Sequence, residues 1–306
     1  MQRIFGGSGT IHAGGTDWRN TMIYFTTKAY NAEHTLRRAV ESILCQTNGD
    51  FCYHLCDNGS TDGTGEIIRE YAKLDKRIVP FFNKRNMEWT PESRAAVPEM
   101  MFHLGPEDWF SVLDADDDFT PDFLEEMQRF VGEYDLDFAA CRSNHIQEPA
   151  GVSHNEVTLT EDIIVEGDDF GIQFPNYFRY MGAKWAKLQK GTLFQRFSQA
   201  ELDRCLATWN LSHRHDTATE LYYLRFSHRA GVRAKMLHNY HLYSVSHSTQ
   251  NLASKERDNE KMPEIYREFL RSKVGYVSEK NENYIQELLE RSQRRTKQLI
   301  IQNGEE

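Results

Sequence analysis

The sequence has no excess of basic residues. Its 306 residues include 36 Lys and Arg against 46 Asp and Glu, a formal net charge of −10. Proteins that bind nucleic acid need a broad basic footprint to neutralise phosphates, so we expect no nucleic-acid partner. Hydrophobic residues make up 39% of the chain, yet no apolar run reaches the roughly 18–20 residues that span a bilayer. We therefore expect no transmembrane segment.

Cysteine is also scarce, with five residues: Cys45, Cys52, Cys56, Cys141 and Cys205. This odd set without a CxxC pair argues against a disulfide framework and against a zinc site. The stretch MQRIFGGSGTIHAGGTDWRN at the start lacks the apolar core of a signal peptide. We expect reduced thiols in a cytoplasmic protein, and leave open whether it docks at the inner face of the membrane.

From residue 21 onward, short β-rich runs alternate with helical patterns. The runs cover 22–27, 51–56, 77–82 and 109–114, and the helical patterns cover 32–46, 63–74 and 120–131. Repeated strand–helix–strand units predict an α/β fold with a mostly parallel sheet flanked by helices. In the third helical pattern, Thr120 is the expected N-cap and Pro121 the expected first-turn proline.

The chain divides into three parts by composition. Residues 1–20 are glycine-rich and form an expected flexible lead-in, and residues 21–254 form one domain. Residues 255–306 carry 11 basic and 11 acidic side chains, a pattern typical of helices with solvated charged faces. We expect this helical extension to serve in self-association, in docking at a membrane surface or in capping the fold.

Polar side chains follow three of the expected strands where each apolar run stops. The stretches are TTKAYN (26–31), CDNGSTDGT (56–64) and LDADDD (113–118). Ligands of α/β sheets bind outside the carboxyl ends of the strands, so we place the candidate site there. Each of the first two stretches alone is equally compatible with ordinary turns, in which Asn, Asp, Gly and Ser predominate.

The third stretch points to a metal. In an extended segment the side chains of Asp114 and Asp116 project to the same side. Two carboxylates suit Mg²⁺ or Mn²⁺, which complete their shells with water and substrate phosphates. A helix N-terminus also attracts acids through its dipole, and this alternative accounts for Asp117 and Asp118 better than for Asp114. We expect Asp117 to support the metal pair and Asp118 to serve the helix start.

These stretches resemble the motifs of the inverting family 2 glycosyltransferases, which have the GT-A fold. FTTKAYNAEHTLRRAVESILCQT is similar to the family's first strand and "YN" turn, DNGSTDGT to its "DDGSTDGT", and LDADDDFTPDFLEE to its "LDxDD…P…LE" element. Three later stretches resemble its "W.KL" segment, its "ED" motif and its tyrosine-rich strand: KWAKLQKGTLFQ (184–195), HDTATELYYL (215–224) and HNYHLYSVSHSTQ (238–250). The likeness covers residues 22–250 and is looser in its second half.

The resemblance implies an enzyme that moves a sugar, with inversion, from a nucleotide-diphosphate donor to an acceptor hydroxyl. The expected donor is a UDP-sugar, and the expected acceptor is a saccharide or a lipid-linked saccharide of cell-surface polysaccharide synthesis. Residues 21–135 would form the nucleotide-sugar half of the domain and residues 136–254 the acceptor half.

Carried over position by position, the resemblance also assigns roles. It assigns nucleotide contacts to Thr27, Tyr30, Asn31, Asp57, Arg94, Asp114 and Ala115. It assigns the divalent metal, Mn²⁺ or Mg²⁺, to Asp116, Asp114 and His247. Asp216 would be the general base, with His215 beside it.

The sequence departs from the family pattern at three positions. Lys28 stands where proline is common, Asn58 replaces the second Asp of "DD", and His215 replaces the Glu before Asp216. The imidazole of His215 could lower the pKa of Asp216 or share its work, and a helix N-cap at this point is compatible with a base.

Some alternatives stay open. Trp185 and Trp209 either stack on an acceptor sugar or belong to the core. A nucleotidyltransferase also uses paired carboxylates and a divalent ion, but would carry a glycine-rich basic loop that TTKAYN lacks. A non-catalytic nucleotide-sugar binder is the alternative if His215 has disabled the base.

Overall fold

The computed structural model describes residues 21–86, 103–153, 159–211, 214–243 and 252–303. Its strands form one sheet in the order β3-β2-β1-β4-β9-β6-β10-β5, with β7 beside β6 and β8 beside β10. The strands are β1 (Ile23–Ala29), β2 (Phe51–Asp57), β3 (Ile78–Phe82), β4 (Trp109–Val112), β5 (Asp118–Phe119), β6 (Phe138–Gln147), β7 (Val152–Ser153), β8 (Ile163–Glu166), β9 (Lys187–Lys190) and β10 (Arg229–Leu242).

The central pairs of this sheet are mostly parallel. β1 runs parallel to β2 and β4, β2 to β3, and β6 to β10. β9 is antiparallel to both β4 and β6, and so joins the two parallel groups. The carboxyl ends of β1, β2 and β4 therefore meet at one edge of the sheet. The predicted α/β fold with a mostly parallel sheet is confirmed.

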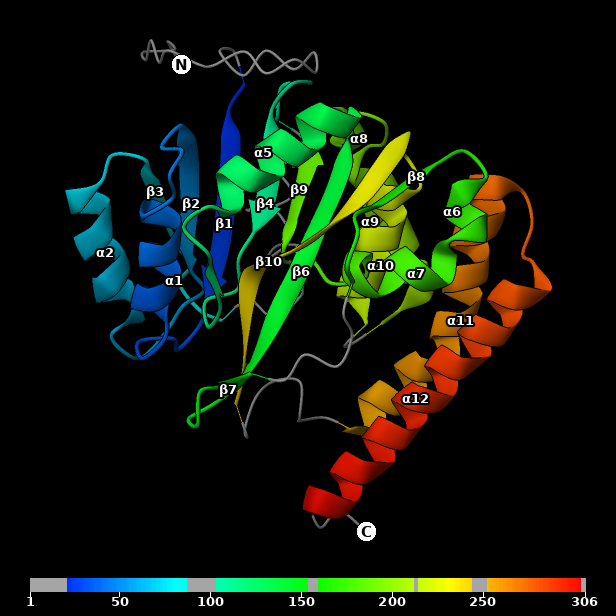
Figure 1. Cartoon of the computed structure of the whole chain (residues 1–306). Helices are drawn as coiled ribbons and strands as arrows, with labels where there is room; N and C mark the ends of the chain where they lie inside the picture. The colour runs from blue at the N-terminus through cyan, green and yellow to red at the C-terminus, as the bar shows by residue number, and fades with distance from the viewer. Residues whose placement is uncertain (1–20, 87–102, 154–158, 212–213, 244–251, 304–306) are drawn as a thin grey trace.

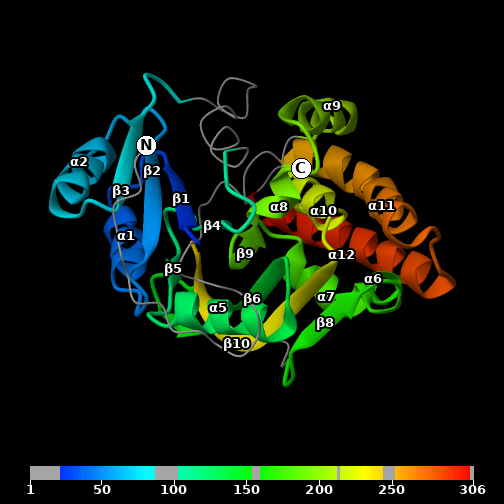
Figure 2. The same ribbon diagram turned by 90° about the horizontal axis from the view of Figure 1, so that it is seen from above.

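Helices cover both faces of the sheet (Figures 1 and 2). They are α1 (Leu36–Leu44), α2 (Thr64–Leu74), α5 (Phe123–Tyr134), α6 (Asp169–Ile172), α7 (Phe174–Met181), α8 (Gly191–Phe194), α9 (Gln199–Trp209), α10 (His215–Leu224), α11 (Leu252–Val274) and α12 (Glu279–Asn303). Neighbouring strand residues alternate between two cores: Trp109 packs with α1, α2 and α5, whereas Phe110 packs with α6 to α12.

Helix α5 begins later than the sequence predicts. Its N-cap is Asp122 and its first helical residue is Phe123, so the expected N-cap role of Thr120 is wrong. The Thr120 hydroxyl instead donates to Asp122 Oδ1 at 2.7 Å. Thr120 and Pro121 thus belong to the connection between β5 and α5.

The helices α11 and α12 form an antiparallel hairpin that is part of the second core (Figure 1). Buried apolar side chains of α11 pack there: Met262, Ile265, Tyr266, Phe269 and Leu270. The predicted domain boundary after residue 254 falls inside α11, which starts at Leu252. No helix in the described part of the chain combines the length and apolarity needed to cross a membrane.

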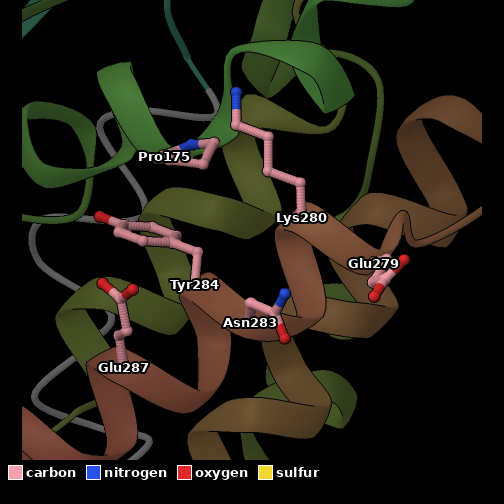
Figure 3. Close-up of a pocket in the computed structure, with 6 residues that line it drawn as sticks. All are labelled: Pro175, Glu279, Lys280, Asn283, Tyr284 and Glu287. Atoms are coloured by element: carbon pink, nitrogen blue, oxygen red, sulfur yellow. The ribbon is translucent and has the colours of Figure 1, made fainter.

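A surface pocket lies between α7 and α12 (Figure 3). Its lining residues are Pro175, Glu279, Lys280, Asn283, Tyr284 and Glu287. None of the predicted site residues lines it. The Tyr284 ring packs edge-on against Phe174 of the second core, so the pocket marks the seam between the hairpin and the rest of the fold.

Candidate functional site

The turns after β1 and β2 are fastened to each other. Asn31 Oδ1 accepts from the Thr61 N–H at 2.9 Å, and the Ser60 hydroxyl accepts from the Asn31 N–H at 3.0 Å. Asn31 has φ of 48°, a left-handed conformation that Asn tolerates better than most residues. The neighbouring Tyr30 is 45% exposed. The YN and DNGST motifs therefore form one polar unit at the carboxyl edge of the sheet.

Asp57 and Asn58 are buried beneath this unit. Asp57 Oδ1 accepts from the Ser60 N–H at 2.9 Å. The Asn58 amide accepts from Asn83 Nδ2 at 2.9 Å and donates to Asn86 Oδ1 at 2.8 Å. A carboxylate can only accept, so the amide suits this position better than the aspartate of the family pattern.

Thr27 does not face the site. It is fully buried, its hydroxyl donates to the Leu113 carbonyl at 2.8 Å, and it accepts from the Tyr53 hydroxyl at 2.9 Å. The Thr27 side chain is thus occupied within the fold, and its contact with the nucleotide stays a prediction. Its role is to fasten β1 to the start of the LDADDD stretch.

The LDADDD stretch is a turn rather than the expected extended segment. The Asp117 N–H donates to the Asp114 carbonyl at 3.2 Å, and Ala115 in the turn is 9% exposed. The Arg38 guanidinium, from α1, donates to the Asp116 carbonyl oxygen, and this hydrogen bond holds the turn against α1. Burial raises the pKa of Asp116 to about 6, and the neighbouring charges of Asp117 and Asp114 add to this effect. The carboxylates of Asp114, Asp116 and Asp117 are therefore close together, although the segment that carries them is a turn and not a strand.

Asp117 supports this turn from inside the fold. Its side chain is fully buried, and burial followed by the charge of Asp114 raises its pKa to about 8. Oδ1 accepts from the His241 N–H at 2.9 Å, while Oδ2 lies 3.4 Å from His238 Nε2. Burial lowers the pKa of His238 to about 3. Burial thus disfavours the charged form of both the carboxyl and the imidazole.

Asp118 has a different partner from the one predicted. It belongs to β5, where Oδ1 accepts from Asn239 Nδ2 and Oδ2 lies near His241 Nε2, each at 2.7 Å. Arg38 Nε is 3.5 Å from the same Oδ2. Asp118 therefore ties β5 to β10 and α1, and the predicted role at the start of a helix is wrong.

Lys184 lies between Asp114 and Asp216, to which the family resemblance assigns separate roles. Its Nζ lies 3.4 Å from Asp114 Oδ1 and 3.7 Å from Asp216 Oδ2. Burial alone would lower the pKa of Lys184, but the charges of Asp114 and Asp216 outweigh it and raise that pKa above its usual value. Sequence reasoning missed this residue, although it opens the KWAKLQK segment.

Asp216 lies in the first turn of α10, and Arg214 is the N-cap residue of that helix. His215 is buried, and its Nε2 is 3.4 Å from Asp216 Oδ1. The positive end of the helix dipole favours a negative charge at this point. The predicted neighbours His215 and Asp216 are thus in contact, with Lys184 on the other side of the carboxylate.

A buried polar layer lies one turn further along α10. Glu220 Oε2 is 3.6 Å from Lys187 Nζ and accepts from Gln189 Nε2 at 2.8 Å. Burial raises the pKa of Glu220 to about 7 even though the charge of Lys187 opposes the shift. These contacts fasten α10 to β9, so the position of Asp216 is set by the sheet as well as by its own helix.

The two tryptophans have different surroundings. The half-buried Trp185 stacks on Tyr240 with ring centroids 5.2 Å apart and an interplanar angle of 6°. Trp209 packs against the second core, and its Nε1 donates to Glu268 Oε2 at 3.3 Å. Trp209 is therefore a structural residue. Trp185, which follows Lys184 in the chain, packs against the first core.

The LDADDD turn would supply only part of the shell of a divalent ion. Among the described residues no group of three or more His, Cys, Asp or Glu could hold a metal by itself. Asp116 and Asp114 supply hard oxygen donors, and a cation would relieve the crowding that raises the pKa of Asp116. Water and diphosphate oxygens would have to complete the shell. Two other predicted residues, Arg94 and His247, lie outside the described residues.

Comparison with known proteins gives matches in sequence. Residues 26–156 match the model of glycosyl transferase family 2. Glycosyltransferase GlyA of Streptococcus pneumoniae is 24% identical over 174 residues, which cover 55% of this chain and 24% of GlyA. The putative teichuronic acid biosynthesis glycosyltransferase TuaG of Bacillus subtilis is 24% identical over 214 residues, 64% of this chain and 81% of TuaG. The chain thus spans only about a quarter of GlyA.

Solved structures are similar in fold. The crystal structure of S. aureus TarS 1–349 in complex with UDP-GlcNAc has a TM-score of 0.64 at 16% identity, over 88% of this chain and 72% of that one. The complex of TarS 1–349 with UDP gives a TM-score of 0.59. The sequence matches show that residues 26–156 are similar to glycosyl transferase family 2, and the solved structures show that the chain shares the GT-A fold.

Proposed function

We propose that this protein transfers a sugar from a UDP-sugar to an acceptor hydroxyl, with inversion at the anomeric carbon. The observation that carries the proposal is the position of Lys184, within 3.4 Å of Asp114 and 3.7 Å of Asp216. One ammonium group thereby brings the LDADDD turn and the start of α10 into a single site. A nucleotide-side carboxylate and a separate base are the minimum set for inverting transfer.

In this proposal Asp216 takes the proton from the acceptor hydroxyl as that oxygen attacks the sugar. The N-terminus of α10 and the ammonium of Lys184 place positive charge beside this carboxylate. His215, in contact with Asp216 Oδ1, holds the orientation of the carboxylate. The replacement of Glu by His at position 215 is therefore compatible with catalysis.

The other half of the site would hold the donor. Asp57, Tyr30 and Asn31 lie at the carboxyl ends of β1 and β2, where the uracil and ribose would bind. Asp116, together with Asp114, would hold Mn²⁺ or Mg²⁺ against the diphosphate. Such an ion supplies Lewis-acid stabilisation of the charge that grows on the leaving group.

The donor and acceptor classes rest on similarity. TarS 1–349 was crystallised in complex with UDP-GlcNAc, which supports a UDP-linked amino sugar or hexose as donor. The name of TuaG connects it with teichuronic acid biosynthesis, which supports a saccharide acceptor of cell-surface polysaccharide synthesis.

The test is a donor panel. The protein is incubated with Mn²⁺ and UDP-, GDP- or dTDP-sugars, and nucleoside diphosphate release is measured for wild type and Asp116→Asn. UDP release that the substitution abolishes supports the proposal. Release of pyrophosphate from UTP and a sugar 1-phosphate in a parallel incubation would indicate a nucleotidyltransferase, and UDP-sugar binding without any turnover would indicate a binding protein; either result overturns the proposal.

A further inference from the structure

The start of helix α10 is held by the hairpin of α11 and α12, which lies beside it in both views (Figures 1 and 2). Arg214, the N-cap residue of α10, has no capping bond from its own side chain. Its backbone N–H donates instead to Asp258 Oδ2 of α11 at 3.1 Å, and Asp258 is 1% exposed. A carboxylate from another helix thus binds at the N-terminus of α10, where negative charge is favoured.

The guanidinium of Arg214 is bound by the same hairpin. Its Nε and Nη2 donate to Asn259 Oδ1 at 3.3 and 3.1 Å, and Nη2 also donates to the Ser292 hydroxyl of α12. Asn259 Oδ1 further accepts from the Ser292 hydroxyl at 2.7 Å, while Asn259 Nδ2 donates to Thr296 Oγ1 at 3.3 Å. Asn259 and Thr296 are both buried, so the network is shielded from water.

This network is distinct from the contacts that hold the hairpin together and in place. Apolar side chains of α11 pack it into the second core, and an ion pair between Arg267 and Glu282 at 3.0 Å links α11 to α12. The polar network reaches Arg214, two residues before Asp216. Lys184 and the Lys187–Glu220 pair hold α10 from the side of the sheet.

We propose that the α11–α12 hairpin is a positioning element for the general base. Asp258 and Asn259, supported by Ser292 and Thr296, fix Arg214 and with it the first turn of α10. The carboxylate of Asp216 is thereby held between the hairpin and the sheet. This inference rests on the proposed function, because it assigns the base to Asp216.

Two variants test it by removing parts of the network. Asn259→Ala removes the acceptor for the guanidinium, and Thr296→Val removes the hydroxyl that holds Asn259 while keeping its volume. For UDP release from UDP-GlcNAc with water as acceptor, we expect Asn259→Ala to lower kcat about tenfold and Thr296→Val about threefold. The donor KM should stay within about twofold, because the nucleotide half is untouched. Asn259→Asp should restore kcat, since its carboxylate still accepts from the Arg214 guanidinium.

Glu282→Gln is the matched control, because it weakens the hairpin at a pair of residues outside the network. It should leave kcat unchanged. Equal kcat in Asn259→Ala and Glu282→Gln, or a rise in donor KM without a fall in kcat, would overturn the inference.

Hydrogen–deuterium exchange gives a readout that needs no turnover. The first turn of α10 should exchange faster in Asn259→Ala than in wild type, while β1 and β2 stay unchanged. Unchanged exchange in α10 would also overturn the inference. An inactive wild type, or a fully active Asp216→Asn, would instead refute the proposed function, so the two failures can be told apart.

Discussion

Replacing Lys184 by Met keeps the apolar stem of the side chain and removes the ammonium that Asp114 and Asp216 share. The two N–O distances are 3.4 and 3.7 Å. At this separation one ion pair is worth ~1 kcal/mol in bulk water and ~4 kcal/mol at an effective dielectric constant of 20. The Lys184 side chain is 29% exposed, so screening favours the lower part of that range, about 1–2 kcal/mol for each pair.

Loss of that energy releases both carboxylates from the geometry in which the ammonium holds them. About 1.4 kcal/mol corresponds to a tenfold change in rate, so kcat for UDP release should fall about tenfold in Lys184→Met. Initial rates of UDP release at saturating UDP-GlcNAc measure this. The matched control is Lys190→Met, which removes a lysine paired with Glu107 at 2.9 Å at the end of β9. A kcat of Lys184→Met equal to that of wild type would refute the role assigned to this lysine.

Three further predictions concern the carboxylates and Asn58. The pKa of Asp116 is raised to about 6, so Mn²⁺ should raise the melting temperature at pH 7.5 and much less at pH 5, where the carboxyl is protonated; an equal shift at both pH values would contradict this. The pKa of Asp117 is raised to about 8 in the fold, so the folded state binds its proton more tightly than the unfolded chain and stability falls from about pH 4 to pH 8. In thermal unfolding, Asp117→Asn should lose less stability over that range than wild type, and parallel curves would contradict the assignment. Asn58→Asp should lower the free energy of unfolding, measured with denaturant, by about 1–3 kcal/mol, because it removes the donor to Asn86 and adds a charge beside Asp57. An unchanged free energy of unfolding would show that the hydrogen bonds of the Asn58 amide are unimportant.

The sequence predicts local features of this protein well. Alternation of β-rich runs and helical patterns predicts the parallel strands, and the buried face of α1, which includes Leu36, Val40 and Ile43, follows from helical spacing. The motifs after β1 and β2 come together as expected, because parallel strands end at one edge of the sheet.

The remaining features depend on tertiary contacts that no local pattern carries. Thr27 belongs to a stretch of the sequence that points to a binding site. Its buried hydroxyl is instead hydrogen-bonded to Tyr53 and Leu113, which lie far away in the sequence. Asp118 binds Asn239 and His241 rather than a helix end. Lys184 stands 70 positions from Asp114 and 32 from Asp216, so its bridging position is visible only once β9 and α10 are packed. The same holds for the contacts between α10 and the hairpin.

The central claim is that Asp216 is the base of a UDP-sugar transferase, and Asp216→Asn tests it most directly. The substitution keeps the size of the side chain and removes its ability to take a proton. The matched control is Asp122→Asn, which neutralises another lysine-paired carboxylate, 2.5 Å from Lys235. We expect UDP affinity by calorimetry to stay within about twofold while UDP release from UDP-GlcNAc falls by about 100-fold or more. Wild-type turnover in Asp216→Asn would contradict the account.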